Sequence, residues 1–179
     1  MKYNRKYQIG VMGSAADLNY SKELEKIAFD VGNEIASSGN ITVYGAEKDY
    51  DSLSTAASRG AKSVGGTTVG VTYGKSNDIW DKDGNTDIII STGMDRGGGR
   101  EFVLVNSCDA IIAVSGGSGT LTEIAIAYQS NIPTIVIGGT GGWADKLADT
   151  YLDNRKRLLT IKADNAKQAV IKVLEELNK

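Results

Sequence analysis

The chain has 179 residues, of which 41% are apolar and 23% are charged, with a formal net charge of −2. This composition is ordinary for a globular protein, and the length predicts a single domain over residues 1–179. The lack of a basic excess argues against nucleic acid or an acidic membrane as a main partner. One cysteine and no histidine exclude an internal disulfide, a zinc cluster and Ser-His-Asp catalysis, and they favour a reducing cytoplasm. The apolar stretch before Gly13 spans only about five residues, which predicts neither a signal peptide nor a membrane span.

Runs of apolar residues alternate along the chain with segments of helical periodicity. The runs predict strands over residues 7–13, 41–44, 67–73, 88–91, 110–114, 134–137 and 158–161. Helices are predicted from 24 to 39 and over 52–63, 102–107, 120–129, 143–152 and 166–177, the last capped by Asn165 and Gln168. Strict alternation without a two-residue hairpin predicts a parallel sheet of about seven strands with helices on both faces. The predicted fold class is therefore α/β, a three-layer Rossmann-like doubly wound sheet.

The most informative segment runs from Ala110 to Glu123, where a uniformly apolar strand passes through a glycine-rich turn into a helix. Gly116, Gly117 and Gly119 permit positive φ angles and close approach of a ligand to the backbone. The N–H groups and the positive end of the following helix then attract an anion. This pattern predicts a phosphate site.

A structural role competes for the end of this segment. Thr120-Leu-Thr-Glu123 fits a capping box, in which Thr120 caps the helix and Glu123 reaches back to the amide of the cap residue. The residues alone leave both roles of Glu123 open.

Ligands of open parallel sheets bind beyond the carboxyl ends of the strands, so the loops after the first, fourth and fifth strands should converge. Arg96 and Arg100 fit bidentate contacts to a phosphate or a ribose, although either could be a solvated loop charge. The predicted ligand-binding residues are Gly13, Ser14, Gly93, Met94, Arg96, Arg100, Ser115, Gly116, Gly117, Ser118, Gly119 and Thr120.

Two other phosphate-binding patterns fit poorly. The first turn lacks the G-x-G-x-x-G of dehydrogenases, and only Glu47, beyond the end of the second strand, keeps a dinucleotide site open. A P-loop is not predicted, because the one Gly-Lys-Ser, at residues 74–76, has Val69 where the motif G-x-x-x-x-G-K-[ST] requires its first glycine. No lysine lies near the glycine turn to form a Schiff base, so pyridoxal phosphate-dependent decarboxylation is not predicted.

The remaining features favour structural roles. Cys108 has no histidine to activate it and is predicted to be a buried, inert thiol. Residues 74–87 form an irregular polar loop; its alternating acidic residues lack the glycine and glutamate positions of a calcium loop, so a solvated loop is favoured. Trp80 in that loop could act as a lid, but local packing is the commoner role. The helix from Leu121 to Tyr128 is apolar on most sides, which predicts burial all round. Either the sheet and neighbouring helices cover it, or it packs against a second subunit, and we expect a homodimer or higher homo-oligomer.

With these residues in place, the chain resembles the superfamily of lonely-guy phosphoribohydrolases, and especially its molybdenum cofactor carrier-like branch of small Rossmann proteins, over about residues 7–162. Ser115-Gly-Gly-Ser-Gly-Thr-Leu-Thr-Glu123 matches the motif P-G-G-x-G-T-x-x-E of the superfamily except that Ser115 replaces proline. Arg100 stands fifteen residues before Ser115, as the arginine of the superfamily does. Gly93-Met94 and the segment Thr140-Gly-Gly-Trp143 resemble the carrier branch.

The resemblance implies roles for two of these residues. In the phosphoribohydrolases, the equivalents of Arg100 and Glu123 are implicated in cleaving the N-glycosidic bond of a nucleoside 5′-monophosphate. The chain departs from that pattern at residues 45–53, at Met94-Asp95 and at Arg100-Glu101, all on the base and sugar side of the pocket. Binding is therefore favoured over hydrolysis.

The sequence thus predicts a carrier or sensor that binds a phosphorylated nucleotide-like or molybdopterin-type ligand, without a metal or a further cofactor. The alternative is a phosphoribohydrolase in which Glu123 is catalytic and Arg100 positions the sugar phosphate.

Overall fold

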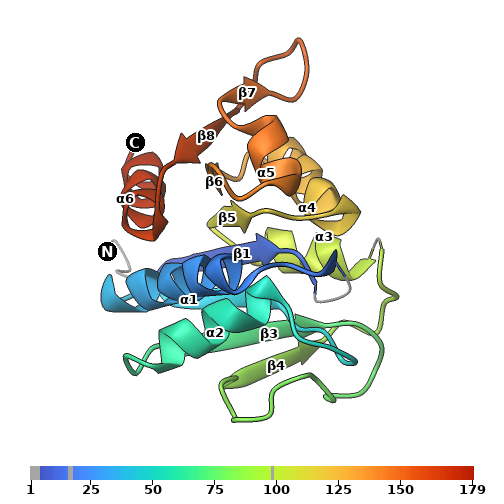
Figure 1. The fold of residues 1–179 in the computed structure, drawn as a ribbon. Helices are drawn as coiled ribbons and strands as arrows, with labels where there is room; N and C mark the ends of the chain where they lie inside the picture. Colours follow the sequence, from blue (N-terminus) through green and yellow to red (C-terminus); the bar gives the residue numbers. More distant parts are fainter. Residues whose placement is uncertain (1–4, 16–17, 98) are drawn as a thin grey trace.

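The computed structural model describes residues 5–15, 18–97 and 99–179. Within these residues eight strands form one sheet in the order β4-β3-β2-β1-β5-β6-β8-β7 (Figure 1). The strands are β1 (Gln8–Gly13), β2 (Ile41–Gly45), β3 (Thr67–Thr72), β4 (Ile88–Ser91), β5 (Ala110–Val114), β6 (Thr134–Ile137), β7 (Thr150–Tyr151) and β8 (Leu159–Ala163). The helices are α1 (Lys22–Ser37), α2 (Leu53–Lys62), α3 (Gly99–Asn106), α4 (Ser118–Gln129), α5 (Gly142–Leu147) and α6 (Ala166–Leu177). The predicted three-layer Rossmann-like α/β fold is confirmed.

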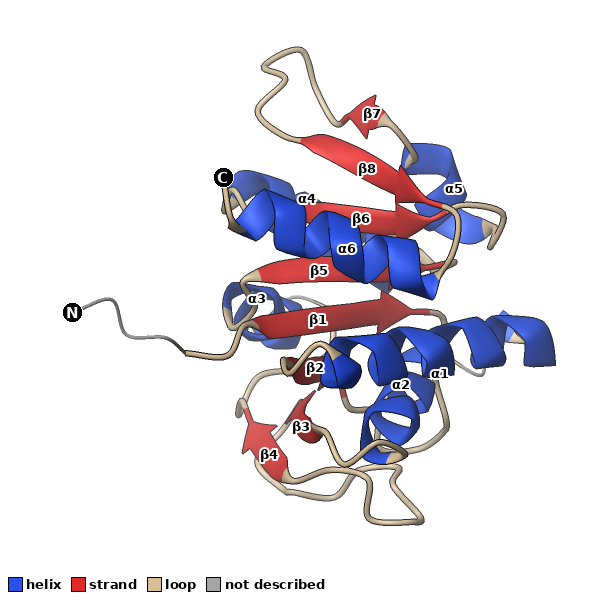
Figure 2. Cartoon of the chain, turned by 90° about the vertical axis from the view of Figure 1, so that its left-hand side faces the viewer, coloured by secondary structure: helices blue, strands red, loops and turns tan. Residues whose placement is uncertain are grey.

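The sheet separates two hydrophobic cores. Helices α1, α2 and α6 cover one face, and α3, α4 and α5 cover the other (Figure 2). Along β5, Ile112 packs into the core under α1, α2 and α6, whereas Ile111 and Ala113 pack into the core under α3, α4 and α5. Burial on both faces explains why β5 is apolar at every position, as is typical of a central parallel strand.

The sheet differs from the expectation near the carboxyl end of the chain. The helix predicted over 143–152 ends at Leu147, and the chain then forms the short strand β7, which pairs antiparallel with β8. The backbone N–H of Lys162 donates to Asp149 Oδ1 at 2.9 Å, where Asp149 adopts a positive φ of 53° and turns the chain. The sheet therefore has an antiparallel edge strand. Asn165 caps α6 as predicted, because its side chain accepts from the Gln168 amide at 2.9 Å.

Helices α1 and α2 lie unusually close together, which fixes the start of α2 against the sheet. A Cβ atom at Gly32 would lie 1.8 Å from the Ala57 carbonyl oxygen, and one at Gly60 would lie 1.8 Å from the Phe29 carbonyl oxygen. Only glycine permits this contact between backbones. Ser52 caps α2 by accepting from the Thr55 amide at 3.0 Å.

Acidic residues of the 74–87 loop stabilise its conformation through hydrogen bonds and an ion pair. Asp81 accepts from the Asn85 amide and from the Thr86 hydroxyl, and Asp87 accepts from the Thr68 amide and pairs with Lys62. Among the residues that the structure describes, no group of three or more acidic, cysteine or histidine side chains is arranged to hold a metal ion.

Two further side chains lie apart from the ligand site that the sequence predicts. Trp80 lines a separate hollow beside α2, where the Lys82 ammonium lies 4.3 Å from the centroid of its ring. Cys108 is buried, and burial raises the pKa of its thiol well above the usual range. An unreactive thiol is the expected consequence. In the described parts of the chain, none of the helices is long and apolar enough to cross a bilayer.

Candidate ligand-binding site

A cavity of about 400 Å³ lies at the carboxyl end of the sheet, where the strand order reverses between β1 and β5. Loops that follow β1, β2, β4 and β5 contribute to it, which is the place where open α/β sheets bind ligands. The lining residues are Gly13, Ser14, Ala15, Leu18, Gly45, Glu47, Tyr50, Ser52, Ser54, Arg96, Gly97, Arg100, Glu101, Gly117, Ser118, Gly119, Thr120, Thr122 and Glu123. Two sides of this cavity differ in chemistry. We call Ser14, Ser54 and residues 117–120 the amide wall, and Glu47, Arg96, Arg100, Glu101 and Glu123 the charged wall.

The glycine turn forms the base of the amide wall. Ser115 and Gly116 have positive φ angles of 57° and 101°. The Ser115 amide donates to Thr140 Oγ1 at 2.9 Å, and the Gly116 amide donates to Ser14 Oγ at 3.0 Å. Proline cannot adopt the φ of Ser115, so a proline at this position would be incompatible with the observed turn.

Helix α4 begins at the cavity without a side-chain cap. Its N-cap is Gly117, which has no side chain that could accept from the first-turn N–H groups. The predicted capping box is therefore wrong: the N-cap lies three residues before Thr120, and Thr120 lies within the first turn of the helix. The first N–H groups of a helix have no intrahelical partner, and here the residues that carry them line the cavity. This arrangement suits an anion.

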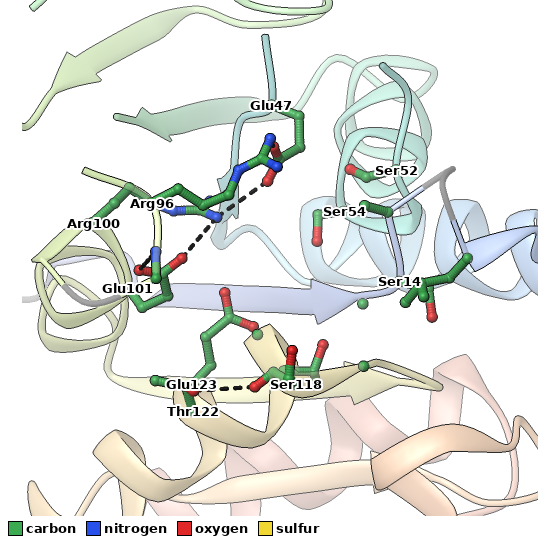
Figure 3. A pocket seen from close by; sticks show the side chains of 18 of the residues that line it. Ser14, Glu47, Ser52, Ser54, Arg96, Arg100, Glu101, Ser118, Thr122 and Glu123 are labelled. Atoms are coloured by element: carbon green, nitrogen blue, oxygen red, sulfur yellow. Dashed lines mark hydrogen bonds and ion pairs between the residues drawn. The ribbon is translucent and has the colours of Figure 1, made fainter. Parts of the chain in front are cut away.

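A cluster of ion pairs forms the charged wall (Figure 3). Arg100 Nη2 donates to Glu47 Oε1 and to Glu101 Oε1, each at 3.1 Å. All three side chains are at least nine-tenths buried. Gly45 makes room for the guanidinium, since a Cβ atom there would lie 2.2 Å from Arg100 Nη1. The buried Nε of Arg100 has no hydrogen-bond partner within the described chain.

Arg96 occupies the outer edge of the charged wall and is 43% exposed. It donates to Glu47 Oε2 and to the hydroxyl groups of Tyr50 and Tyr73. Its guanidinium carbon also lies 5.2 Å and 5.0 Å from the centroids of the two tyrosine rings. Glu47 therefore binds both arginines.

Glu123, on α4, completes the charged wall. Its residue is only 7% exposed, and Figure 3 shows its carboxyl group pointing from α4 into the cavity. Burial raises the pKa of this carboxyl group to about 8, against the opposing attraction of Arg100. Glu123 is therefore mostly protonated at neutral pH, which leaves two carboxylates balanced by two guanidinium groups on the charged wall.

The structure distributes the predicted ligand residues over three locations. The lining of the cavity contains Gly13, Ser14, Arg96, Arg100, Gly117, Ser118, Gly119, Thr120 and Glu123. Ser115 and Gly116 lie behind the turn, where their carbonyl oxygens accept from the amides of Ala144 and Trp143 at 3.0 Å. Gly93 and Met94 are not among the lining residues, and Met94 is 47% exposed.

Several lining residues were not predicted. Glu101 is visible in the sequence only as a departure from a known pattern, and Glu47 also as an acidic residue beyond the second strand. The pairing of Glu47 with Arg100 depends on the packing of α3 against the end of β2, whereas Glu101 is next to Arg100 in the chain. Ser52 and Ser54 were assigned only to a helix. The feature from which they could be predicted is their position at the start of α2, because the strand order places this helix start beside the glycine turn.

The chain is similar in sequence and fold to several known proteins. The molybdenum cofactor carrier protein of Chlamydomonas reinhardtii is 33% identical and has a TM-score of 0.81, with 98% of this chain and 100% of that chain covered. The molybdenum cofactor binding protein of Rippkaea orientalis is 27% identical with a TM-score of 0.77, over 99% and 100% of the two chains. An uncharacterised protein of Archaeoglobus fulgidus is 37% identical over 141 residues, which are 74% of this chain and 84% of the relative.

The family comparison spans almost the whole sequence. The profile of the SLOG cluster4 family matches residues 6–171. The match and the solved relatives confirm the superfamily, which the motif from Ser115 to Glu123 predicts, and its carrier-like branch, which Gly93-Met94 and the segment Thr140-Gly-Gly-Trp143 predict. The chain belongs to the SLOG cluster4 family.

Proposed function

We propose that the protein binds a phosphorylated small molecule of the pterin or nucleotide type and carries it without chemical change. The observation that carries this proposal is the start of α4: an N-terminus without a side-chain cap that lines a cavity large enough for such a ligand. A phosphate there would accept from first-turn amides and would lie at the positive end of the helix.

The ion pairs of the charged wall also favour placing the phosphate at the start of α4. Arg100 already donates to two carboxylates, so it meets a phosphate only if an ion pair is lost. The amide wall has no comparable commitment. We therefore assign the phosphate to residues 117–120, with Gly13 and Ser14 beside them, and the rest of the ligand to the charged wall.

Two solved relatives are a molybdenum cofactor carrier protein and a molybdenum cofactor binding protein, which makes a molybdopterin-type ligand the first candidate cargo. We propose no cofactor besides this cargo. Because Leu121, Ala125 and Ile126 of the apolar helix α4 are only partly buried, we also propose a homo-oligomer. The single buried thiol is consistent with a cytoplasmic setting.

Gly119 offers a direct test. A Cβ atom at this position meets nothing within 4 Å, so the fold accepts a side chain there. Gly119→Asp adds a negative charge in the first turn, which suits the helix but repels a phosphate. We expect its affinity for AMP, GMP or a phosphorylated pterin, measured by calorimetry, to fall by roughly tenfold or more. Gly119→Asn is the control of matched size and should bind within roughly threefold of the natural protein.

The phosphate-free ligands provide the complementary measurement. Adenosine, guanosine and the dephosphorylated pterin should bind weakly to the natural protein, and Gly119→Asp should not weaken them further. Equal affinity for phosphorylated and phosphate-free ligands would overturn the assignment of the phosphate to α4.

The burial and raised pKa of Glu123 support a second candidate function, the hydrolysis of a nucleoside 5′-monophosphate. A buried carboxyl group with a pKa near 8 can act as a general acid at neutral pH. The test is incubation with AMP and GMP and chromatographic detection of free base. Release that disappears in Glu123→Gln would establish the hydrolase, whereas tight binding without release over hours would establish the carrier.

A further inference from the structure

A second helix starts at the same cavity. Both Ser52, the N-cap of α2, and Ser54, in its first turn, line the cavity beside the glycine turn. The Ser52 hydroxyl is occupied, because it accepts from the Thr55 amide at 3.0 Å and lies 2.9 Å from Thr55 Oγ1. The Leu53 amide is also occupied, since it donates to the Ser14 carbonyl oxygen at 2.9 Å.

Ser54 differs from these neighbours. Its residue is only 5% exposed, and within the described chain its hydroxyl has no hydrogen-bond partner. Figure 3 shows this hydroxyl directed into the cavity. The cavity reaches this hydroxyl, so a ligand or water there can bind it. Its own amide lies in the first turn of a ten-residue helix, where no intrahelical acceptor exists.

Ser14 joins this helix start to that of α4. Its carbonyl oxygen accepts from Leu53 at the start of α2, while its hydroxyl accepts from Gly116 in the turn that leads into α4. One residue after β1 therefore fixes both helix starts around a common space. The first turns of α2 and α4 contain no acidic residue, whereas that of α1 contains Glu23 and Glu25. Neither first turn therefore contains a carboxylate. Asp51, just before the N-cap of α2, accepts from the Ser52 amide at 2.8 Å, and its charge is paired with Arg59.

We propose that the cavity binds a ligand with two anionic groups, one at the start of α4 and the second at the start of α2, where the Ser54 hydroxyl and amide donate to it. This inference rests on the proposed function and specifies its ligand class. A diphosphate, or a phosphate ester that carries a second oxyanion, fits this arrangement better than a simple monophosphate does.

The experiment follows both helix starts at once. Isotope-labelled full-length protein is titrated with inorganic phosphate at constant ionic strength, and amide shifts are recorded by heteronuclear NMR. We expect separate responses at Ser54 and at residues 118–120. Ser54→Asp should weaken the response at α2 by roughly tenfold and leave that at α4 within roughly twofold, and Gly119→Asp should do the reverse. Ser54→Asn and Gly119→Asn are the uncharged controls, and amide dispersion verifies that each variant folds.

The outcomes separate the two proposals. A response at residues 118–120 alone, or a response at Ser54 that Ser54→Asp does not weaken, overturns the second subsite and leaves the proposed function intact. A response at Ser54 alone overturns the assignment of the phosphate to α4. The absence of any response overturns both.

Discussion

The two walls of the cavity differ in their hydrogen-bond donors and in how far these donors are already paired. The amide wall consists of helix starts and small residues, and its donors are backbone N–H groups and hydroxyls whose positions the fold fixes. The charged wall consists of long side chains whose donors and acceptors are largely paired with one another. Two arginines beside a cavity therefore do not by themselves make an anion site. We therefore propose the amide wall as the place for a phosphate, because its donors are not paired with carboxylates.

The largest expected effect concerns the neutrality of the charged wall, which depends on the proton of Glu123. The folded protein keeps this proton up to a pKa of about 8, whereas the unfolded chain releases it near the ordinary value of 4.5. Between these values the unfolded state binds fewer protons, so the free energy of unfolding falls as pH rises, by up to ~1.4 kcal/mol per pH unit. Above about 8 this dependence ends. Over the whole interval the loss is roughly 5 kcal/mol.

Urea unfolding of the natural protein and of Glu123→Gln, from acidic to alkaline pH, measures this effect. The amide of the variant does not titrate, so the variant should lack this part of the pH dependence and gain stability over the natural protein as pH rises. A difference between the two proteins that stays constant across the interval would show that Glu123 is ionised in the folded state, and the charged wall would then carry a net negative charge.

The sequence was sufficient for features that depend on local pattern. The apolar run of β5 predicts a central strand and the glycines after it predict a turn with positive φ, because strand burial and turn conformation leave direct marks on residue type. That this turn binds phosphate stays a prediction. The start of α4 was predicted wrongly, since Thr120 and Glu123 satisfy the spacing of a capping box equally well inside a helix that starts earlier. The pairing of Glu47 with Arg100 could not be predicted, because it joins residues 53 positions apart through the packing of α3.

The next largest effect tests whether close backbone packing of α5 against the glycine turn stabilises the amide wall. Gly142, at the start of α5, has a φ of 62°, and a Cβ atom there would lie 2.5 Å from the Gly116 carbonyl oxygen and 2.7 Å from the Ser115 carbonyl carbon. Gly142→Ala should lower the free energy of unfolding by roughly 3 kcal/mol, from the left-handed conformation and from the collision with backbone. Gly139→Ala is the matched control, because Gly139 also has a positive φ of 77° but has open space around it. It should lose only ~1 kcal/mol. If denaturant titrations give the same loss of unfolding free energy for both variants, the turn shifts to accommodate a side chain at residue 142.

The smallest effect separates the walls most clearly. Glu47→Gln removes the carboxylate that binds both Arg96 and Arg100, while Arg100 keeps Glu101 and Arg96 keeps two tyrosine hydroxyls. The loss of charge-assisted hydrogen bonds should lower the free energy of unfolding by about 2 kcal/mol. Phosphate affinity should rise several-fold, because the arginines then contribute an uncompensated positive charge near the cavity. Calorimetry with inorganic phosphate, beside a urea titration, measures both quantities. If affinity falls together with stability, Glu47 positions an arginine that itself binds the phosphate, and the anion belongs on the charged wall.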